Sequence, residues 1–119
     1  MAPLTDPERL RAYKNALDNW AYSGYVRFQL TEQSRHWVRE TLGIALNDIG
    51  RLMHEYVAAG GEIDEVRETR PEWSSEHKFH YDLRFTIEGV PVYLETRLHD
   101  YQPFEPDRPW IQVVNVHAP

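Results

Sequence analysis

Six polar side chains that can move protons or bind phosphate are spaced two residues apart within two short segments. Histidine is the usual proton shuttle in proteins, and guanidinium groups stabilise the anion that forms when a phosphodiester is attacked. The six residues are His80, Asp82, Arg84, Tyr93, Glu95 and Arg97. They predict a ribonuclease that uses no metal, in which Tyr93 binds substrate and the other five residues form the catalytic group.

Two other interpretations of these residues stay open. Such charges can form a structural ladder on a solvated or helix-covered sheet face, because ion-pair networks shift pKa values without being catalytic. The same face could instead bind a ligand or a protein partner. Asp82 and Glu95 would repel each other if they were directly opposed, so Arg84 and Arg97 are expected to bracket them.

A second group of basic residues lies earlier in the chain, on an expected helix. Arg35 and Arg39 share one helix face, and His36 lies beside them. If this helix packs at the end of the sheet, these three residues bind substrate phosphate. Surface ion pairs with Glu32 or Glu40 are the alternative.

The remaining histidines and the absence of cysteine bear on metals and cofactors. His117 ends the last expected strand, where it could approach His80 or the arginine cluster, and we assign it to substrate binding. His77 and His80 are three residues apart and would point to opposite faces of a strand, and the chain contains no cysteine. We therefore expect no metal site and no cofactor.

The hairpin that would position the six residues has a clear pattern. Apolar residues alternate with polar ones from residue 79 to 87 and again from 90 to 98, on either side of Glu88-Gly89. A two-residue turn there pairs Leu83 with Leu94 on a buried face. On the other face the same register pairs Asp82 with Glu95 and His80 with Arg97, and it also places Phe79 opposite Leu98.

Around this hairpin the chain reads as one α+β domain spanning residues 1–119. We expect an extra N-terminal helix at about 6–22, a helix from Thr31 to Gly43, and a third helix from Ile44 to about residue 57. A charged edge strand follows at 62–70, then a loop at 71–75, the hairpin, a proline-rich segment at 101–109 and a last strand at 110–117 that is covered on both sides. The predicted fold has N-terminal helices packed on a four-stranded antiparallel sheet, in the order α-α-α-β-β-β-β.

The composition narrows the function classes. The formal net charge is −6 and the calculated pI is about 5.4, so the chain is a poor general binder of nucleic acid unless its basic residues cluster. The first residues contain no apolar run of signal-peptide length and no window approaches a membrane span. We expect a cytoplasmic protein without membrane contact, and its oligomeric state is open.

Three segments of the chain, with the order of the expected elements, match a known pattern: SRHWVRETLGI, HYDLRFTIEGVPVYLETRL and IQVVNVHAP, within roughly residues 31–119. In these segments the chain resembles the BrnT-like and MqsR-like toxins of the RelE-like group of toxin–antitoxin proteins. Its nearest match is the pattern SxHALERMxERGIxxEDV, here at Ser34, Arg35, His36, Arg39, Gly43 and Ile44. The resemblance implies metal-independent cleavage of RNA, with RNA or the ribosome and a small antitoxin as partners. A diverged, non-enzymatic interaction module on the same scaffold is the alternative.

Overall fold

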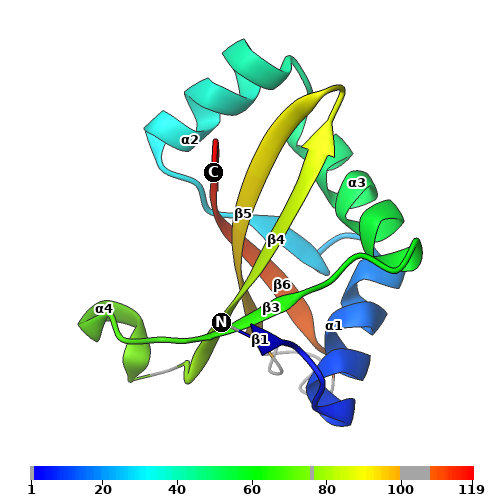
Figure 1. Ribbon diagram of the computed structural model, residues 1–119, viewed down its shortest axis with the longest axis vertical. Coiled ribbons are helices and arrows are strands. Elements are labelled where there is room, and N and C mark those ends of the chain that lie inside the picture. The colour runs from blue at the N-terminus through cyan, green and yellow to red at the C-terminus, as the bar shows by residue number, and fades with distance from the viewer. Residues whose placement is uncertain (1, 76, 100–107) are drawn as a thin grey trace.

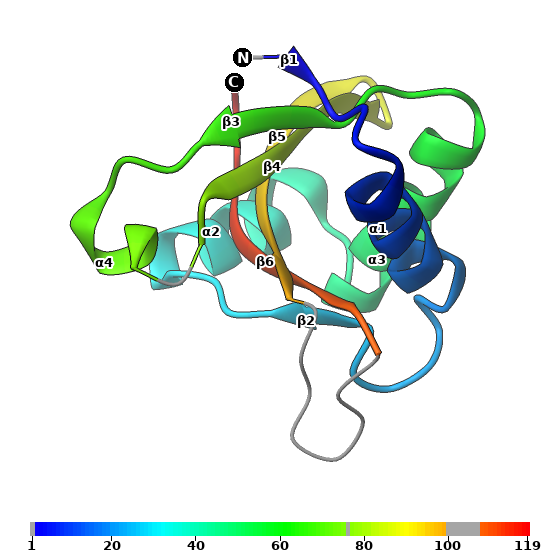
Figure 2. The same ribbon diagram turned by 90° about the horizontal axis from the view of Figure 1, so that it is seen from below.

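The computed structural model describes residues 2–75, 77–99 and 108–119, which form a sheet with helices on both sides (Figures 1 and 2). The strands are β1 (Ala2–Pro3), β2 (Val26–Phe28), β3 (Asp64–Arg67), β4 (Phe79–Ile87), β5 (Val90–His99) and β6 (Trp110–His117). The helices are α1 (Pro7–Asp18), α2 (Glu32–Trp37) with the π-helix η1 (Val38–Leu42), α3 (Leu46–Ala58) and α4 (Pro71–Ser74).

The α+β class is confirmed, but the predicted four-stranded antiparallel sheet is wrong. The sheet has six strands in the order β1-β3-β4-β5-β6-β2, and it is mixed because β2 runs parallel to β6. β1 and β2 are two and three residues long. Segments this short carry no period-two signal of their own, and only pairing with distant strands makes them part of the sheet.

The β4–β5 hairpin has the predicted register over its described ladder. Pairs run from Ile87–Val90 at the turn to Tyr81–Thr96, with Leu83 opposite Leu94. Glu88 and Gly89 have φ angles of 49° and 82°. Two positive φ values are the geometry of the tight hairpin turn that matches strand twist.

The predicted pairs beyond Thr96 are wrong. The β4–β5 ladder ends at Tyr81–Thr96, so His80 does not pair with Arg97 and Phe79 does not pair with Leu98. Along its other edge β4 pairs with β3, where Val66 lies opposite His80.

The hydrophobic core lies between the sheet and helices α1 and α3, which cover the same face (Figure 2). Leu83 and Leu94 are fully buried in it, as predicted. α1 contributes Tyr13, Ala16 and Leu17, and α3 contributes Ile49, Met53 and Val57. Tyr13 also donates a hydrogen bond to Thr96 at 2.9 Å, and Thr96 donates in turn to the Tyr81 carbonyl at 2.7 Å, so α1 is fixed to the hairpin by a buried polar chain.

The helix boundaries follow local capping chemistry. The Asp6 side chain accepts a hydrogen bond from the Arg9 amide at the start of α1, and Thr31 does the same for Ser34 at the start of α2. Gly43, with φ of 66°, ends η1 in the left-handed conformation, as predicted. α1 ends at Asp18 rather than at residue 22.

Three other expectations concern the strands and loops. The last strand is buried at both parities, as expected, because Gln112, Val113 and Val114 are all buried. The predicted loop at 71–75 contains the short helix α4, and the predicted edge strand at 62–70 is β3, which β1 covers in part. The proline-rich segment lies mostly outside the described residues, which resume at Arg108. Within the described ranges, no helix has the length and apolar character that a membrane span needs.

Candidate functional site

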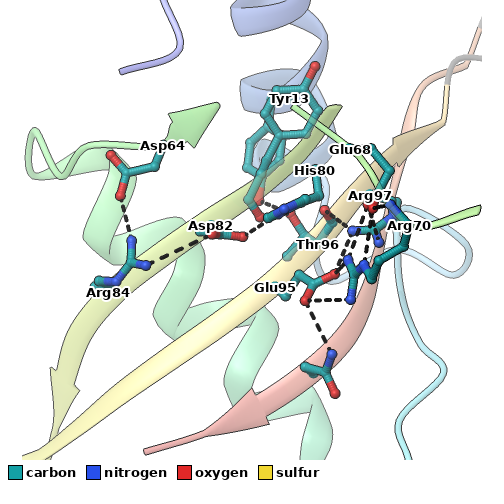
Figure 3. Close-up of polar contacts among 12 residues, drawn as sticks. Tyr13, Asp64, Glu68, Arg70, His80, Asp82, Arg84, Glu95, Thr96 and Arg97 are labelled. Carbon is teal, nitrogen blue, oxygen red and sulfur yellow. Dashed lines mark hydrogen bonds and ion pairs between the residues drawn. The ribbon is translucent and has the colours of Figure 1, made fainter. Parts of the chain in front are cut away.

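The polar residues of the hairpin lie on the sheet face opposite the core. Strand pairing aligns Asp64, Asp82, Glu95 and Asn115 in one row across β3, β4, β5 and β6. It aligns Arg84, Tyr93 and His117 in the next row. The structure therefore brings seven predicted site residues to one face: His80, Asp82, Arg84, Tyr93, Glu95, Arg97 and His117. Figure 3 labels His80, Asp82, Arg84, Glu95 and Arg97 among them.

Arg97 is the buried centre of an ion-pair network, which we call the Arg97 network: Glu68, Arg70, Glu95 and Arg97. The side chain of Arg97 is fully buried, with Nη2 at 2.7 Å from Glu68 Oε2 and Nη1 at 2.8 Å from Glu95 Oε2. Arg70 bridges the same two carboxylates, with Nε at 3.0 Å from Glu68 Oε1 and a further contact to Glu95. The network holds Arg97 away from any ligand at the surface (Figure 3).

The segment that follows β3 packs against this network. The Trp73 ring of α4 covers the Arg97 guanidinium at 4.7 Å, and Asn115 of β6 donates to Glu95 at 3.2 Å. The Glu68 amide donates to the Lys78 carbonyl at 2.8 Å, which extends the β3–β4 pairing by one residue pair. α4 therefore packs against one end of the polar face through Trp73.

The electrostatics of the network keep its carboxylates ionised. Burial opposes ionisation of Glu68, but hydrogen bonds from Arg70 and the charge of Arg97 outweigh burial and lower its pKa to about 2. Burial likewise opposes ionisation of Glu95, and the two arginines again prevail and lower its pKa. Hydrogen bonds to both carboxylates raise the pKa of Arg70.

A second cluster, the His80 cluster, comprises His80, Asp82, Arg84, Asp64 and Tyr93. His80 Nδ1 lies 2.8 Å from Asp82 Oδ1. A carboxylate only accepts, so Nδ1 carries a proton and the neutral ring keeps the lone pair on Nε2. Nε2 makes no hydrogen bond with any described residue, and 13% of the His80 side chain is exposed.

Asp82 is bracketed by cationic and neutral donors, as the sequence predicts for opposed carboxylates. Arg84 lies 4.0 Å from Asp82 and donates to Asp64 at 2.8 Å, and 40% of its side chain is exposed. Burial and hydrogen bonding to Asp82 raise the pKa of Tyr93, which keeps its phenol protonated. The prediction that Arg84 and Arg97 bracket the two opposed carboxylates is confirmed, because Arg84 lies beside Asp82 and Arg97 Nη1 lies 2.8 Å from Glu95 Oε2. Arg97 also pairs with Glu68.

The basic residues of α2 and η1 stand apart from both clusters. Arg35, His36 and Arg39 are all exposed. Arg35 donates to the Leu30 carbonyl at 3.4 Å, and Arg39 pairs with Glu40 at 3.2 Å, the surface pairing named as the alternative. No contact described for the three joins them to the hairpin, so their assignment to substrate binding stays a prediction.

Glu68, Arg70 and Trp73 are the site residues that sequence reasoning missed. Glu68 follows Asp64 by four residues along the β3 segment, so both side chains face the polar side of the sheet. The alternation of side chains along this strand could therefore have identified Glu68. Arg70 and Trp73 lie beyond the strand, where no periodicity applies. In the described ranges, no three His, Asp or Glu side chains converge as a metal site would require.

Comparison with protein-family models, with curated proteins and with solved structures gave no match to this chain. The resemblance to RelE-like toxins therefore remains a prediction. The polar face itself offers one histidine held by a buried carboxylate and the partly exposed guanidinium of Arg84, beside an ion-pair network in which Arg97 is buried and Arg70 is 38% exposed.

Proposed function

We propose that this domain is a toxin-like, metal-independent ribonuclease in which His80 is the general base and Arg84 stabilises the anion. The observation that supports the proposal is the His80–Asp82 pair. A buried carboxylate 2.8 Å from Nδ1 orients the ring and leaves Nε2 as a proton acceptor. In a toxin–antitoxin system the partners would be RNA or the ribosome and a small antitoxin protein.

The proposed reaction uses the 2′-hydroxyl of RNA as the nucleophile. His80 Nε2 takes the 2′-hydroxyl proton while the 2′-oxygen forms a bond to the adjacent phosphorus. The bond from phosphorus to the 5′-oxygen breaks, and that oxygen takes a proton from water. The products are a 2′,3′-cyclic phosphate and a 5′-hydroxyl, and no oxidant, reductant or metal is consumed.

The roles of the hairpin arginines differ in this proposal from the sequence-based expectation. Arg84 is 40% exposed and lies on the same strand as His80, two residues from Asp82. Its charge can offset the extra negative charge on the phosphorane. Arg97 and Glu95 hold the fold together, because Arg97 is fully buried between two carboxylates.

The test is cleavage of a labelled RNA transcript by the purified protein, with and without ribosomes. His80→Ala should lower the rate by about 10²–10⁴, the usual range for a lost general acid or base. Activity should persist in EDTA, because the base and the cation are both side chains. His54→Ala is the matched control, since His54 is also hydrogen-bonded to an aspartate, Asp18 at 3.1 Å, on the helices of the opposite face.

If the wild-type protein cleaves no RNA and its expression causes no growth arrest, the ribonuclease proposal is refuted. Cleavage that is unchanged in His80→Ala would remove His80 from the mechanism. Cleavage that disappears in EDTA would contradict a reaction carried by side chains alone.

A non-enzymatic interaction module is the second candidate, and the charge balance of the face favours it. Four carboxylates (Asp64, Glu68, Asp82 and Glu95) meet three guanidinium groups (Arg70, Arg84 and Arg97) on this face, and most of them pair with one another. Four negative charges against three positive ones leave this face without any net positive charge to attract phosphate. Under this alternative the hairpin would bind a protein, and the RNA assays above would be negative.

A further inference from the structure

Three planar side chains form a stack across the polar face beside His80. The Arg84 guanidinium lies 4.8 Å from the centre of the Tyr93 ring, and the His117 ring lies 4.8 Å from it with a tilt of 32°. β4 and β6 flank β5 on opposite sides. Arg84 and His117 therefore cover the two faces of Tyr93, and His117 is the terminal plane of the stack.

The His117 ring is held in place and is open to solvent. Its Nδ1 donates to the Ala118 carbonyl at 2.7 Å, which fixes the plane of the ring. The residue is exposed. The ladder between β2 and β6 ends at Phe28–Val113, four residues before His117, so no strand among the described residues pairs with β6 beside the ring. α2 takes over at this edge, where Ser34 accepts a hydrogen bond from the Val116 amide at 3.3 Å.

We propose that a nucleobase extends this stack by lying on the outer face of His117. Heteroaromatic bases stack on flat side chains regardless of base identity, because every base has a π-face. A stack whose inner members are already packed presents its terminal ring without further ordering of the side chain. The ligand class is therefore a planar heteroaromatic base, from an RNA strand or from a free nucleotide.

The role of this subsite in RNA cleavage rests on the proposed function. The position of the subsite further requires that the RNA be single-stranded there. β4 and β6 are two strand spacings apart, roughly 10 Å. The base on His117 therefore belongs to a nucleotide next to the scissile phosphate, and not to the nucleotide whose 2′-hydroxyl proton His80 takes. A base can lie there only if it is unpaired, because a duplex keeps its bases stacked on one another.

The experiment measures binding separately from cleavage. Fluorescence anisotropy with a labelled 2′-O-methyl octanucleotide reports binding alone, since its blocked 2′-oxygens cannot attack phosphorus. His117→Ala should weaken binding by about 5- to 150-fold, the range for loss of one base–aromatic stack. His117→Trp should restore binding, and His54→Ala should leave it unchanged. With an oligonucleotide that lacks the base at one position, wild type and His117→Ala should bind with equal affinity.

The outcomes separate the ligand sources and the two proposals. Competition by adenosine monophosphate at the same concentration as the oligonucleotide would assign the subsite to free nucleotides, and weak competition would assign it to a strand. Equal binding by wild type and His117→Ala, or no binding by the wild type at low salt, would overturn the subsite. A failed cleavage assay with intact, His117-dependent binding would overturn the ribonuclease and leave the subsite standing.

Discussion

Removing the buried guanidinium of Arg97 should destabilise the fold more than removing any exposed charge of the hairpin. Arg97 is fully buried, and its partners Glu68 and Glu95 are 1% and 7% exposed. Arg97→Met keeps most of the aliphatic volume and deletes the charge. Both carboxylates then remain buried with Arg70 as their shared cation.

Two considerations set the expected loss. Removing one partner of a buried ion pair costs about 3–5 kcal/mol when the other charge stays buried without compensation, but here Arg70 still pairs with both carboxylates. The pKa of Glu68 falls from 4.5 to about 2, which corresponds to about 3 kcal/mol of stabilisation at neutral pH, and the hydrogen bonds from Arg70 contribute more to this shift than the charge of Arg97 does. We therefore expect Arg97→Met to lower the free energy of unfolding by about 1–3 kcal/mol, the cost of leaving buried acceptors of Glu68 and Glu95 without their donor.

The assay is urea denaturation at pH 7, with Arg84→Met as the matched control. Arg84 loses the same chemical group from a side chain that is 40% exposed, where an ion pair contributes about 0–1 kcal/mol. The denaturant slope should be equal in the three proteins, so that the midpoints report stability. Equal midpoints for the two variants would refute the argument that the Arg97 network stabilises the fold.

The pH dependence of the same measurement has a definite sign. The folded pKa of Glu68 is depressed, so its contribution is complete above about pH 4.5 and is lost as the pH falls toward 2. Wild-type stability should therefore drop over this window, with Glu95 adding to the loss. Arg97→Met should show a smaller drop, and identical pH profiles would contradict the assignment.

Three further changes test the core, the α1 contact and the turn. Leu83→Ala should cost about 2–5 kcal/mol in denaturant melts, whereas Thr86→Ala at an exposed position of the same strand should stay within about 0.5 kcal/mol. Tyr13→Phe should cost about 0.5–1.5 kcal/mol, because it removes the hydrogen bond donated to Thr96; no change in the thermal midpoint would contradict this. Glu88→Asn should gain up to about 1 kcal/mol, since asparagine tolerates the positive φ of 49° better; a loss would mean that the Glu88 side chain has a role in the turn.

The parts of the fold that could be predicted from the sequence are those set by residues close to one another in the chain. The register of the hairpin was recoverable because Glu88-Gly89 and the parity of both strands agree within about twenty residues. β2 was not recoverable, because its three residues pair with Ile111 to Val113, more than eighty positions away. Caps such as Thr31 and Gly43 were recoverable because their chemistry acts over one helical turn.

The sequence predicted which residues share the polar face, but not that they separate into two clusters. Parity alone places His80, Asp82, Glu95 and Arg97 on one face, as the structure has them. Their separation into the His80–Asp82 pair and the Arg97 network depends on Arg70, which approaches from outside the hairpin. No spacing within the hairpin could reveal that contact, so Arg97 was assigned to catalysis.

The position of β6 has a consequence for how the chain reaches its native state. β6 lies inside the sheet, between β5 and β2, although it follows all the other strands in chain order. Neither neighbour can complete its backbone hydrogen bonds until β6 arrives, and the β2–β6 pairing closes a very long loop. The hairpin can form early, but the domain should fold slowly for its size, and β2 should gain protection against amide exchange only in the last step.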